Sequence, residues 1–307
     1  MFVVRQFFRD LMVLTKFRIN VVGVFTGYAA LLVHGALHPE APALGLGGTL
    51  LLLLALLLTG GAANACNQIV ERERDGRMAR TRHKRPLPSG RMRVSTAVLL
   101  ALAQQVGAVL LFVLVFDSWL GAALSLFTSF YYVVIYTWLL KPRHYLNIVI
   151  GGVPGAMGPL VAWAAVAQDL DWPAIALFAI IFLWTPPHFW ALAIRLREDY
   201  AKAGIPMLPV VKGVDETTRQ IFVYTVILVA GTLLVPLLLP AAFGASPVFF
   251  ITACLGGLVF LVWTWRLWKR RPVADTMPLF HWSILYIGLL FTAVIADALI
   301  IGGRGHG

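Results

Sequence analysis

The chain has 307 residues, of which 60% are hydrophobic and only 13% charged, and its mean hydropathy is +0.83. A water-soluble domain of this length does not need so apolar a composition, so we exclude one and predict a single integral membrane domain over residues 1–307. The two cysteines, Cys66 and Cys254, lie in separate apolar stretches and offer neither a disulfide framework nor metal-ligand spacing.

Apolar stretches of about 20 residues, the length that crosses a bilayer, recur along the chain between short polar breaks. The sequence therefore predicts an all-α polytopic membrane protein, a bundle of nine transmembrane helices. We place these helices near residues 19–37, 46–70, 94–116, 118–140, 146–168, 172–194, 219–240, 246–267 and 279–301. The first follows a basic segment, as a secretory signal does, but it is long for that role and no clear cleavage site follows, so we expect it to be retained. Residues 2–12 mix aromatic side chains with arginines, which favours a short helix in the headgroup region over a frayed terminus.

The basic residues are distributed unevenly about these predicted helices. Of the 25 lysines and arginines, 24 precede or open the first helix or belong to even-numbered loops, and Arg304 is the exception. The positive-inside rule then predicts a multi-pass cell (inner) membrane protein with its amino terminus and even-numbered loops in the cytoplasm and its carboxyl terminus outside. The net charge of +11 thus needs no nucleic-acid partner, and we expect the active site to face the cytoplasm.

Two cytoplasmic loops are larger than the others and carry clustered carboxylates. One runs from Glu71 to Arg93 between helices 2 and 3, and the other from Arg195 to Arg219 between helices 6 and 7. We expect these two loops to form the walls of the active site.

The first acidic cluster begins at the end of the second predicted helix. Asn67, Glu71 and Asp75 follow one another at i, i+4 and i+8, so on a helix they share one face. Oxygen ligands in such a line suit Mg²⁺, with a diphosphate completing the coordination. The alternative is a solvated helix end on which these carboxylates pair with neighbouring arginines. Against it stands Asn67, an amide at the edge of an apolar span, where a polar group needs a partner.

A dense cationic run from Met78 to Arg85 follows these carboxylates. Its cations could bind phosphate oxygens and stabilise the negative charge that grows as a diphosphate departs, with Arg80 and Lys84 as the favoured pair. The run is equally explained as a topology signal or a contact with anionic lipid. Lys141 and Arg143, at the end of the fourth predicted helix, are two more candidates for diphosphate binding.

A second cluster lies at the end of the sixth predicted helix. Asp199 could support or orient a cation on the diphosphate, and Arg195 and Lys202 could hold phosphate. His188 lies near the membrane interior, where an ionisable side chain indicates a functional site, although a hydrogen-bonded packing histidine explains it equally well. In the fifth predicted helix, the small residues of the segment 151–159 allow either close helix packing or space for a ligand.

Taken together, three groups of residues resemble one family of enzymes. They are the Asn67, Glu71, Asp75, Met78, Arg80 and Thr81 pattern, the Pro187-His188-Phe189 triplet, and Asp199-Tyr200 with the segment 203–209. The chain resembles, over nearly its whole length, the protoheme IX farnesyltransferases (heme O synthases), a branch of the UbiA-type intramembrane prenyltransferases. In two places it departs from the usual superfamily pattern. Glu71 stands where an aspartate is common, which keeps the ligand type, and the second motif is reduced to Asp199, which fits the heme branch better than the quinone branch.

The resemblance implies a reaction and the residues that perform it. A farnesyl group would pass from farnesyl diphosphate to the vinyl group of protoheme IX (heme B), giving heme O and diphosphate. The cofactor would be Mg²⁺, held by Asn67, Glu71, Asp75 and Asp199 as the catalytic and metal-binding residues. Diphosphate would bind to a set of basic residues, namely Arg80, Lys84, Lys141, Arg143, Arg195 and Lys202. His188 and Tyr200 would bind heme.

The implied partners are the two substrates, the lipid bilayer, and heme A synthase or terminal oxidase assembly as receiver of the product. Two other functions stay open on the residues alone. One is a UbiA-type prenyltransferase acting on an aromatic quinone precursor. The other is a membrane transporter or heme-handling scaffold, which intramembrane polar residues also favour and which would release no diphosphate.

Overall fold

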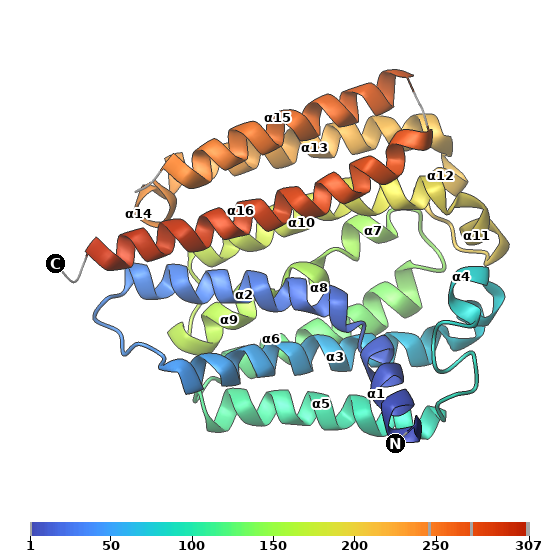
Figure 1. Cartoon of the computed structure of the whole chain (residues 1–307), viewed down its shortest axis with the longest axis horizontal. Coiled ribbons are helices and arrows are strands. Elements are labelled where there is room, and N and C mark those ends of the chain that lie inside the picture. The colour runs from blue at the N-terminus through green and yellow to red at the C-terminus, as the bar shows by residue number, and fades with distance from the viewer. Residues whose placement is uncertain (1, 245–246, 271–272, 305–307) are drawn as a thin grey trace.

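The computed structural model describes residues 2–244, 247–270 and 273–304, and all regular secondary structure in these ranges is helical (Figure 1). Within them, nine segments are long and apolar enough to cross a membrane, which confirms the predicted number. The first four are α2 (Phe17–Leu37), α3 (Leu46–Arg77), α5 (Val94–Leu114), and α6 (Trp119–Phe130) continued by the π-helix η1 (Tyr131–Leu140). The remaining five comprise α7 (Asn147–Ile150), α8 (Val153–Ala156) and α9 (Gly158–Ala167) as one segment, then α10 (Trp172–Arg195), α13 (Gly213–Leu238), α15 (Pro247–Arg270), and η2 (Val273–Asp275) with α16 (Thr276–Arg304). The predicted domain of 1–307 also includes residues 1, 245–246, 271–272 and 305–307, which lie outside the described residues.

Two of the predicted helix ends were wrong at the large loops. Helix α3 continues to Arg77, beyond the expected end at residue 70, and α13 begins at Gly213, before the expected start at 219. Hydropathy marks only the stretch that is apolar enough to lie in lipid, whereas glutamate and arginine favour helix and prolong it into water. As a result, Glu71 and Asp75 lie on a helix and not in a loop.

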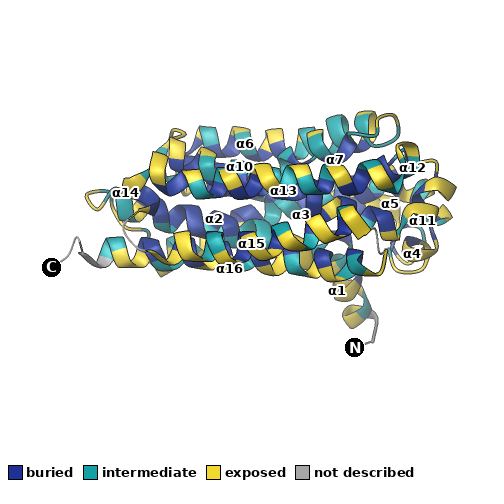
Figure 2. Cartoon of the chain, turned by 90° about the horizontal axis from the view of Figure 1, so that it is seen from above, coloured by how far each residue is buried: buried dark blue, intermediate teal, exposed yellow. Residues whose placement is uncertain are grey.

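The outer surface of the bundle carries apolar side chains. Figure 2 shows exposed residues along the outward faces of the long helices and buried residues between the helices. Large exposed residues include Leu50, Leu99, Leu237 and Leu255. A continuous apolar surface of this kind needs lipid around it, so the protein is a multi-pass membrane protein.

The fifth membrane segment is discontinuous, because a turn at residues 151–152 separates α7 from α8 and the non-helical Met157 separates α8 from α9. Pro154 and Pro159 each occupy the first turn of a new short helix, the helical position that tolerates proline. Of the two roles expected of the small residues, close helix packing is found at Gly158, whereas Gly155 is exposed. A Cβ on Gly158 would collide with the carbonyl oxygen of Gly23 on α2, whereas a Cβ on Gly155 would meet nothing within 4 Å.

One end of the bundle gathers the short helices that the large loops form. Figures 1 and 2 place α4 (Ala79–Arg82), α11 (Arg197–Lys202) and α12 (Leu208–Val211) together at this end. The predicted amino-terminal helix is present as α1 (Phe2–Leu14), which turns across the bundle axis near the same end and exposes Phe8 and Met12. Helix α16 runs to the opposite end, as an odd number of spans requires.

Candidate active site

Helix α3 brings the three predicted oxygen ligands together inside the protein. Asn67, Glu71 and Asp75 share one face of the helix and are 1%, 2% and 0% exposed. The alternative interpretation, a solvated helix end, applies only to the opposite face of α3. There Arg72 and Glu73 are exposed, and the Arg72 guanidinium lies 3.6 Å from the Glu73 carboxylate. Three buried polar side chains in a row need partners, and the surrounding helices supply them.

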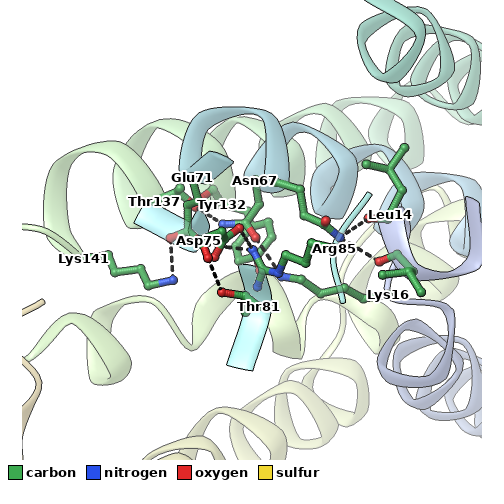
Figure 3. Close-up of polar contacts among 12 residues, drawn as sticks. Leu14, Lys16, Asn67, Glu71, Asp75, Thr81, Arg85, Tyr132, Thr137 and Lys141 are labelled. Atoms are coloured by element: carbon green, nitrogen blue, oxygen red, sulfur yellow. Dashed lines mark hydrogen bonds and ion pairs between the residues drawn. The ribbon is translucent and has the colours of Figure 1, made fainter. Parts of the chain in front are cut away.

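Three cations from separate segments converge on this face (Figure 3). The Lys16 ammonium donates to Asn67 Oδ1 over 2.7 Å and to the hydroxyl of Tyr132 over 3.0 Å. The Arg85 guanidinium is hydrogen-bonded to Asp75 and lies 3.6 Å from Glu71, and the Lys141 ammonium is ion-paired with Glu71. Three basic side chains thus face two carboxylates, an arrangement that suits a polyanionic ligand.

Two of these cations lie just outside the membrane segments, and their surroundings alter their acidity. Burial and the neighbouring Arg85 lower the pKa of Lys16 to about 7, although Glu71 partly opposes them. Burial also acts to lower the pKa of Lys141, but the contact with Glu71 outweighs it, and the pKa of Lys141 is raised. Lys141 therefore stays charged.

The break between α1 and α2 positions Lys16. This residue has a left-handed backbone with φ 47°, and it separates the two helices. The side-chain amide of Gln68, beside Asn67 on α3, donates to the carbonyl oxygens of Val13 and Leu14 over 2.7 and 2.9 Å. These bonds supply partners to carbonyl groups at the end of α1, where Val13 also accepts from the backbone N–H of Lys16 over 3.2 Å, and they hold Lys16 over the carboxylate face.

The π-helix η1 forms the facing wall. Thr137 Oγ1 donates to the carbonyl oxygen of Tyr132 over 2.7 Å and accepts a hydrogen bond from the Asn67 amide over 3.0 Å. The rings of Tyr132 and Tyr136 are stacked 5.6 Å apart, and Lys141 follows directly after the π-helix. Because π-helical turns are rare and concentrate at functional sites, this wall supports the assignment of an active site.

The second acidic cluster is near this site but does not join it. Asp199 is half-buried on α11, at the same end of the bundle as α4. Tyr200 is buried and lies close enough to Lys141 to affect the pKa of that residue. Among the described residues, no three histidine, cysteine, aspartate or glutamate side chains form a metal-binding group, so Asp199 is not brought together with Glu71 and Asp75.

The predicted diphosphate ligands divide into two groups. Lys141 lies at the carboxylates, whereas the other five are exposed: Arg80, Lys84, Arg143, Arg195 and Lys202. The Arg143 guanidinium donates to the carbonyl oxygens of Trp138 and Leu139 over 2.8 and 3.2 Å. The favoured pair of Arg80 and Lys84 is thus on the surface, while Arg85, from the same cationic run, points inward.

His188 lies in a packed aromatic layer between α10 and α16. Its ring stacks on Trp184 at 4.2 Å and on Phe280 at 4.4 Å, and its Nδ1 is 2.7 Å from the hydroxyl of Ser283. Helix α10 continues through the two prolines that precede His188. These contacts fix the orientation of the ring, and they are compatible with both interpretations of His188 that the sequence left open.

Sequence reasoning missed Lys16, Arg85, Tyr132 and Thr137 as members of the site. Arg85 belongs to the predicted cationic run but was not singled out, and Lys16 was counted only as a topology signal. The tyrosine and threonine lie within an apolar span and carry no motif. The sequence feature that could have identified Lys16 is its position immediately before the first apolar stretch, at the same membrane face as the carboxylates.

Comparison with known proteins agrees with this fold. Residues 21–285 match the model of the UbiA prenyltransferase family. Among solved structures, a digeranylgeranylglyceryl phosphate synthase superposes with a TM-score of 0.76 at 16% identity, covering 97% of this chain and 99% of that one. A UbiA homolog from Archaeoglobus fulgidus bound to DMAPP and Mg²⁺ superposes with a TM-score of 0.62 at 17% identity, covering 93% and 99%. The chain therefore belongs to the UbiA prenyltransferase family and is a membrane-embedded prenyltransferase.

Its place within that family follows from a more similar relative. The protoheme IX farnesyltransferase of Picosynechococcus sp. is 43% identical over 292 residues, which cover 93% of this chain and 87% of the relative. The chain thus belongs with the protoheme IX farnesyltransferases.

Proposed function

We propose that this protein transfers the farnesyl group of farnesyl diphosphate to the vinyl group of protoheme IX, giving heme O and releasing diphosphate. The observation that carries the chemistry is the convergence of Arg85 and Lys141 on the buried carboxylates of Glu71 and Asp75, with Lys16 bound to Asn67 on the same face. The choice of substrates is supported by the names of the relatives that match over most of the chain.

The donor atoms on α3 fit Mg²⁺. Asp75 Oδ1 is buried without a hydrogen-bond partner among the described residues, and the Glu71 oxygens are ion-paired but accept no hydrogen bond there. Carboxylate and amide oxygens are the ligands that this ion prefers, so Asn67, Glu71 and Asp75 would hold it. When bound, Mg²⁺ would neutralise charge on the diphosphate oxygens. Asp199 is proposed to bind a second cation on the same diphosphate.

The cations of the site are proposed to bind and stabilise the leaving group. Arg85, Lys141 and Lys16 turn from the carboxylates to the phosphate oxygens when substrate arrives, and the exposed Arg80, Lys84, Arg143, Arg195 and Lys202 attract and guide it. The carbon–oxygen bond breaks with its electron pair leaving on the diphosphate. The stacked rings of Tyr132 and Tyr136 offer π-faces to the allylic cation that forms.

The acceptor half of the reaction completes the balance of atoms. The heme vinyl group forms the new bond to the allylic carbon, and water captures the resulting cation with loss of a proton, leaving a hydroxyethylfarnesyl side chain. His188 and Tyr200 are proposed to bind the heme, and the product to pass to heme A synthase or terminal oxidase assembly. No protein nucleophile takes part.

The test is a reconstitution with purified protein, Mg²⁺, labelled farnesyl diphosphate and heme B. We expect release of pyrophosphate and a heavier, labelled porphyrin, and we expect chelation of Mg²⁺ to abolish both. A parallel reaction with a phenolic quinone precursor should give no labelled product. Labelling of the phenol in place of the heme would replace our proposal with the quinone alternative, and no pyrophosphate with either acceptor would refute both.

A further inference from the structure

Helix α1 is joined to the loop between α4 and α5 by one ion pair. The Arg91 guanidinium donates through Nε to both carboxylate oxygens of Asp10, over 3.0 and 3.3 Å. The side-chain amide of Gln6, one turn earlier on α1, donates to the same carboxylate over 2.9 Å. Asp10 is almost fully buried, whereas the Arg91 side chain is 33% exposed.

Arg91 also fixes the backbone of its own loop. Its two Nη groups donate to the carbonyl oxygens of His83 and Lys84 over 2.9 and 3.0 Å. The next residue is Arg85, whose guanidinium reaches Asp75 and Glu71. A continuous series of polar contacts therefore runs from α1, through Arg91 and two backbone carbonyls, to the cation at the carboxylates.

These polar contacts act beside a small apolar cluster, in which Leu14 of α1 packs with Leu87 and Met92 of the loop. A cavity of about 360 Å³ lies beside the ion pair, lined by Gln6, Phe7, Asp10, Arg91, Met92, Arg93 and Thr96. This pocket is partly open, so no side chain fills the space beside the ion pair, and the guanidinium is what joins Asp10 to the loop at this point. The far end of α1 is held independently, by the Gln68 bonds to Val13 and Leu14.

We propose that Asp10 and Arg91 are positioning residues, which hold the loop of residues 83–91 so that Arg85 meets the diphosphate. The inference rests on the proposed function. Under this proposal, the packing of α1 on the bundle contributes to substrate binding. If the loop holds Arg85 in the binding position for only a fraction of the time, the apparent affinity for the diphosphate falls by that fraction. The substrate can still draw the loop into place at saturation.

Arg91→Lys tests this role in the full-length protein. Lysine can pair with Asp10, but its single nitrogen cannot bind the carboxylate and two carbonyl groups together. We expect KM for farnesyl diphosphate to rise by about tenfold while kcat stays within about twofold, as for a loop competent about one tenth of the time. Asp10→Asn should act in the same direction, and Arg93→Lys, an exposed neighbour on the same loop, should leave both constants unchanged.

A purely structural role predicts a different result, namely a lower thermal midpoint and a lower kcat at unchanged KM. That pattern, or an unchanged KM in Arg91→Lys, would overturn the proposal. Hydrogen exchange of the segment 79–92 supplies a readout without turnover. We expect faster exchange in Arg91→Lys than in wild type, and slowing on addition of Mg²⁺ with inorganic pyrophosphate. Equal exchange rates in the two proteins would refute the positioning role of Arg91. If the wild-type protein forms no product, only the proposed function is refuted.

Discussion

At the scale of single residues, the site consists of charges that compensate one another away from water. Glu71 and Asp75 are buried, Arg85 contacts both carboxylates, and Lys141 is ion-paired with Glu71. Removing one member of such a group leaves another charge buried without compensation, which costs more than the pair itself contributes. Substitutions here should therefore keep the shape of the side chain, so that loss of function is not confused with loss of folding.

Asp75→Asn keeps the shape and removes the charge. If Asp75 holds Mg²⁺ on the diphosphate, turnover should fall by at least about 100-fold, since one key electrostatic group is worth roughly 3 to 4 kcal/mol. The measurement is pyrophosphate release by purified protein. Glu73→Gln, an exposed carboxylate on the other face of α3, is the matched control and should retain turnover. Full activity of Asp75→Asn would remove its assigned role.

His188→Ala separates the two substrates. Loss of the imidazole should raise KM for heme B by about tenfold, equal to about 1.4 kcal/mol, and change KM for farnesyl diphosphate much less. Ser283→Ala, which removes the hydrogen-bond partner of the ring but keeps the stack on Trp184 and Phe280, serves as the comparison. Equal weakening of both substrates would assign His188 to packing alone.

At the scale of elements, the site depends on where helices end and break. Helix α3 carries the carboxylates because it continues two turns beyond its apolar stretch, and Lys16 reaches them because α1 and α2 are interrupted there. The i, i+4, i+8 spacing predicted the shared face of Asn67, Glu71 and Asp75, since that relation is local. The inward turn of Arg85 and the approach of Lys16 could not be predicted, because they depend on loop geometry and on helices distant in sequence.

Two glycines of the fifth membrane segment should respond differently to the same change. Gly158→Ala places a methyl group against the Gly23 carbonyl and should destabilise the packing of α9 on α2 by about 1 to 3 kcal/mol. Gly155→Ala meets open space and should keep stability close to wild type. Thermal unfolding in detergent measures both. Equal midpoints for the two variants would show that the helices separate easily.

At the scale of the whole molecule, hydropathy predicted the architecture well. All nine segments appear within a few residues of their expected places, apart from the extended helix ends. Bilayer thickness fixes the length of an apolar helix, so this part of the fold depends on local composition. The broken fifth segment and the π-helix were not predicted, because hydropathy does not distinguish one helical pattern from another.

The charge distribution predicts orientation, which can be measured on the intact membrane. A cysteine placed at Ser89, in the second loop, should be labelled by a membrane-impermeant thiol reagent only after the cytoplasmic face is opened. A cysteine at Pro39, in the first loop, should be labelled in intact cells. Cys66 and Cys254 are replaced beforehand in both variants. The reverse labelling pattern would place the carboxylate site outside the cell.

The π-helix η1 has a consequence for changes in chain length. Its wider turns set the angle at which Lys141 leaves the fourth membrane segment and meets Glu71. Deleting one residue between Tyr131 and Leu140 would let the segment relax into an ordinary α-helix, in which each residue is offset by about 100° around the axis. The ammonium group would then swing away from its carboxylate, although every side chain of the site is retained. Apart from Tyr132, Tyr136 and Thr137, natural variation in this part of the protein should therefore replace residues more freely than it changes their number.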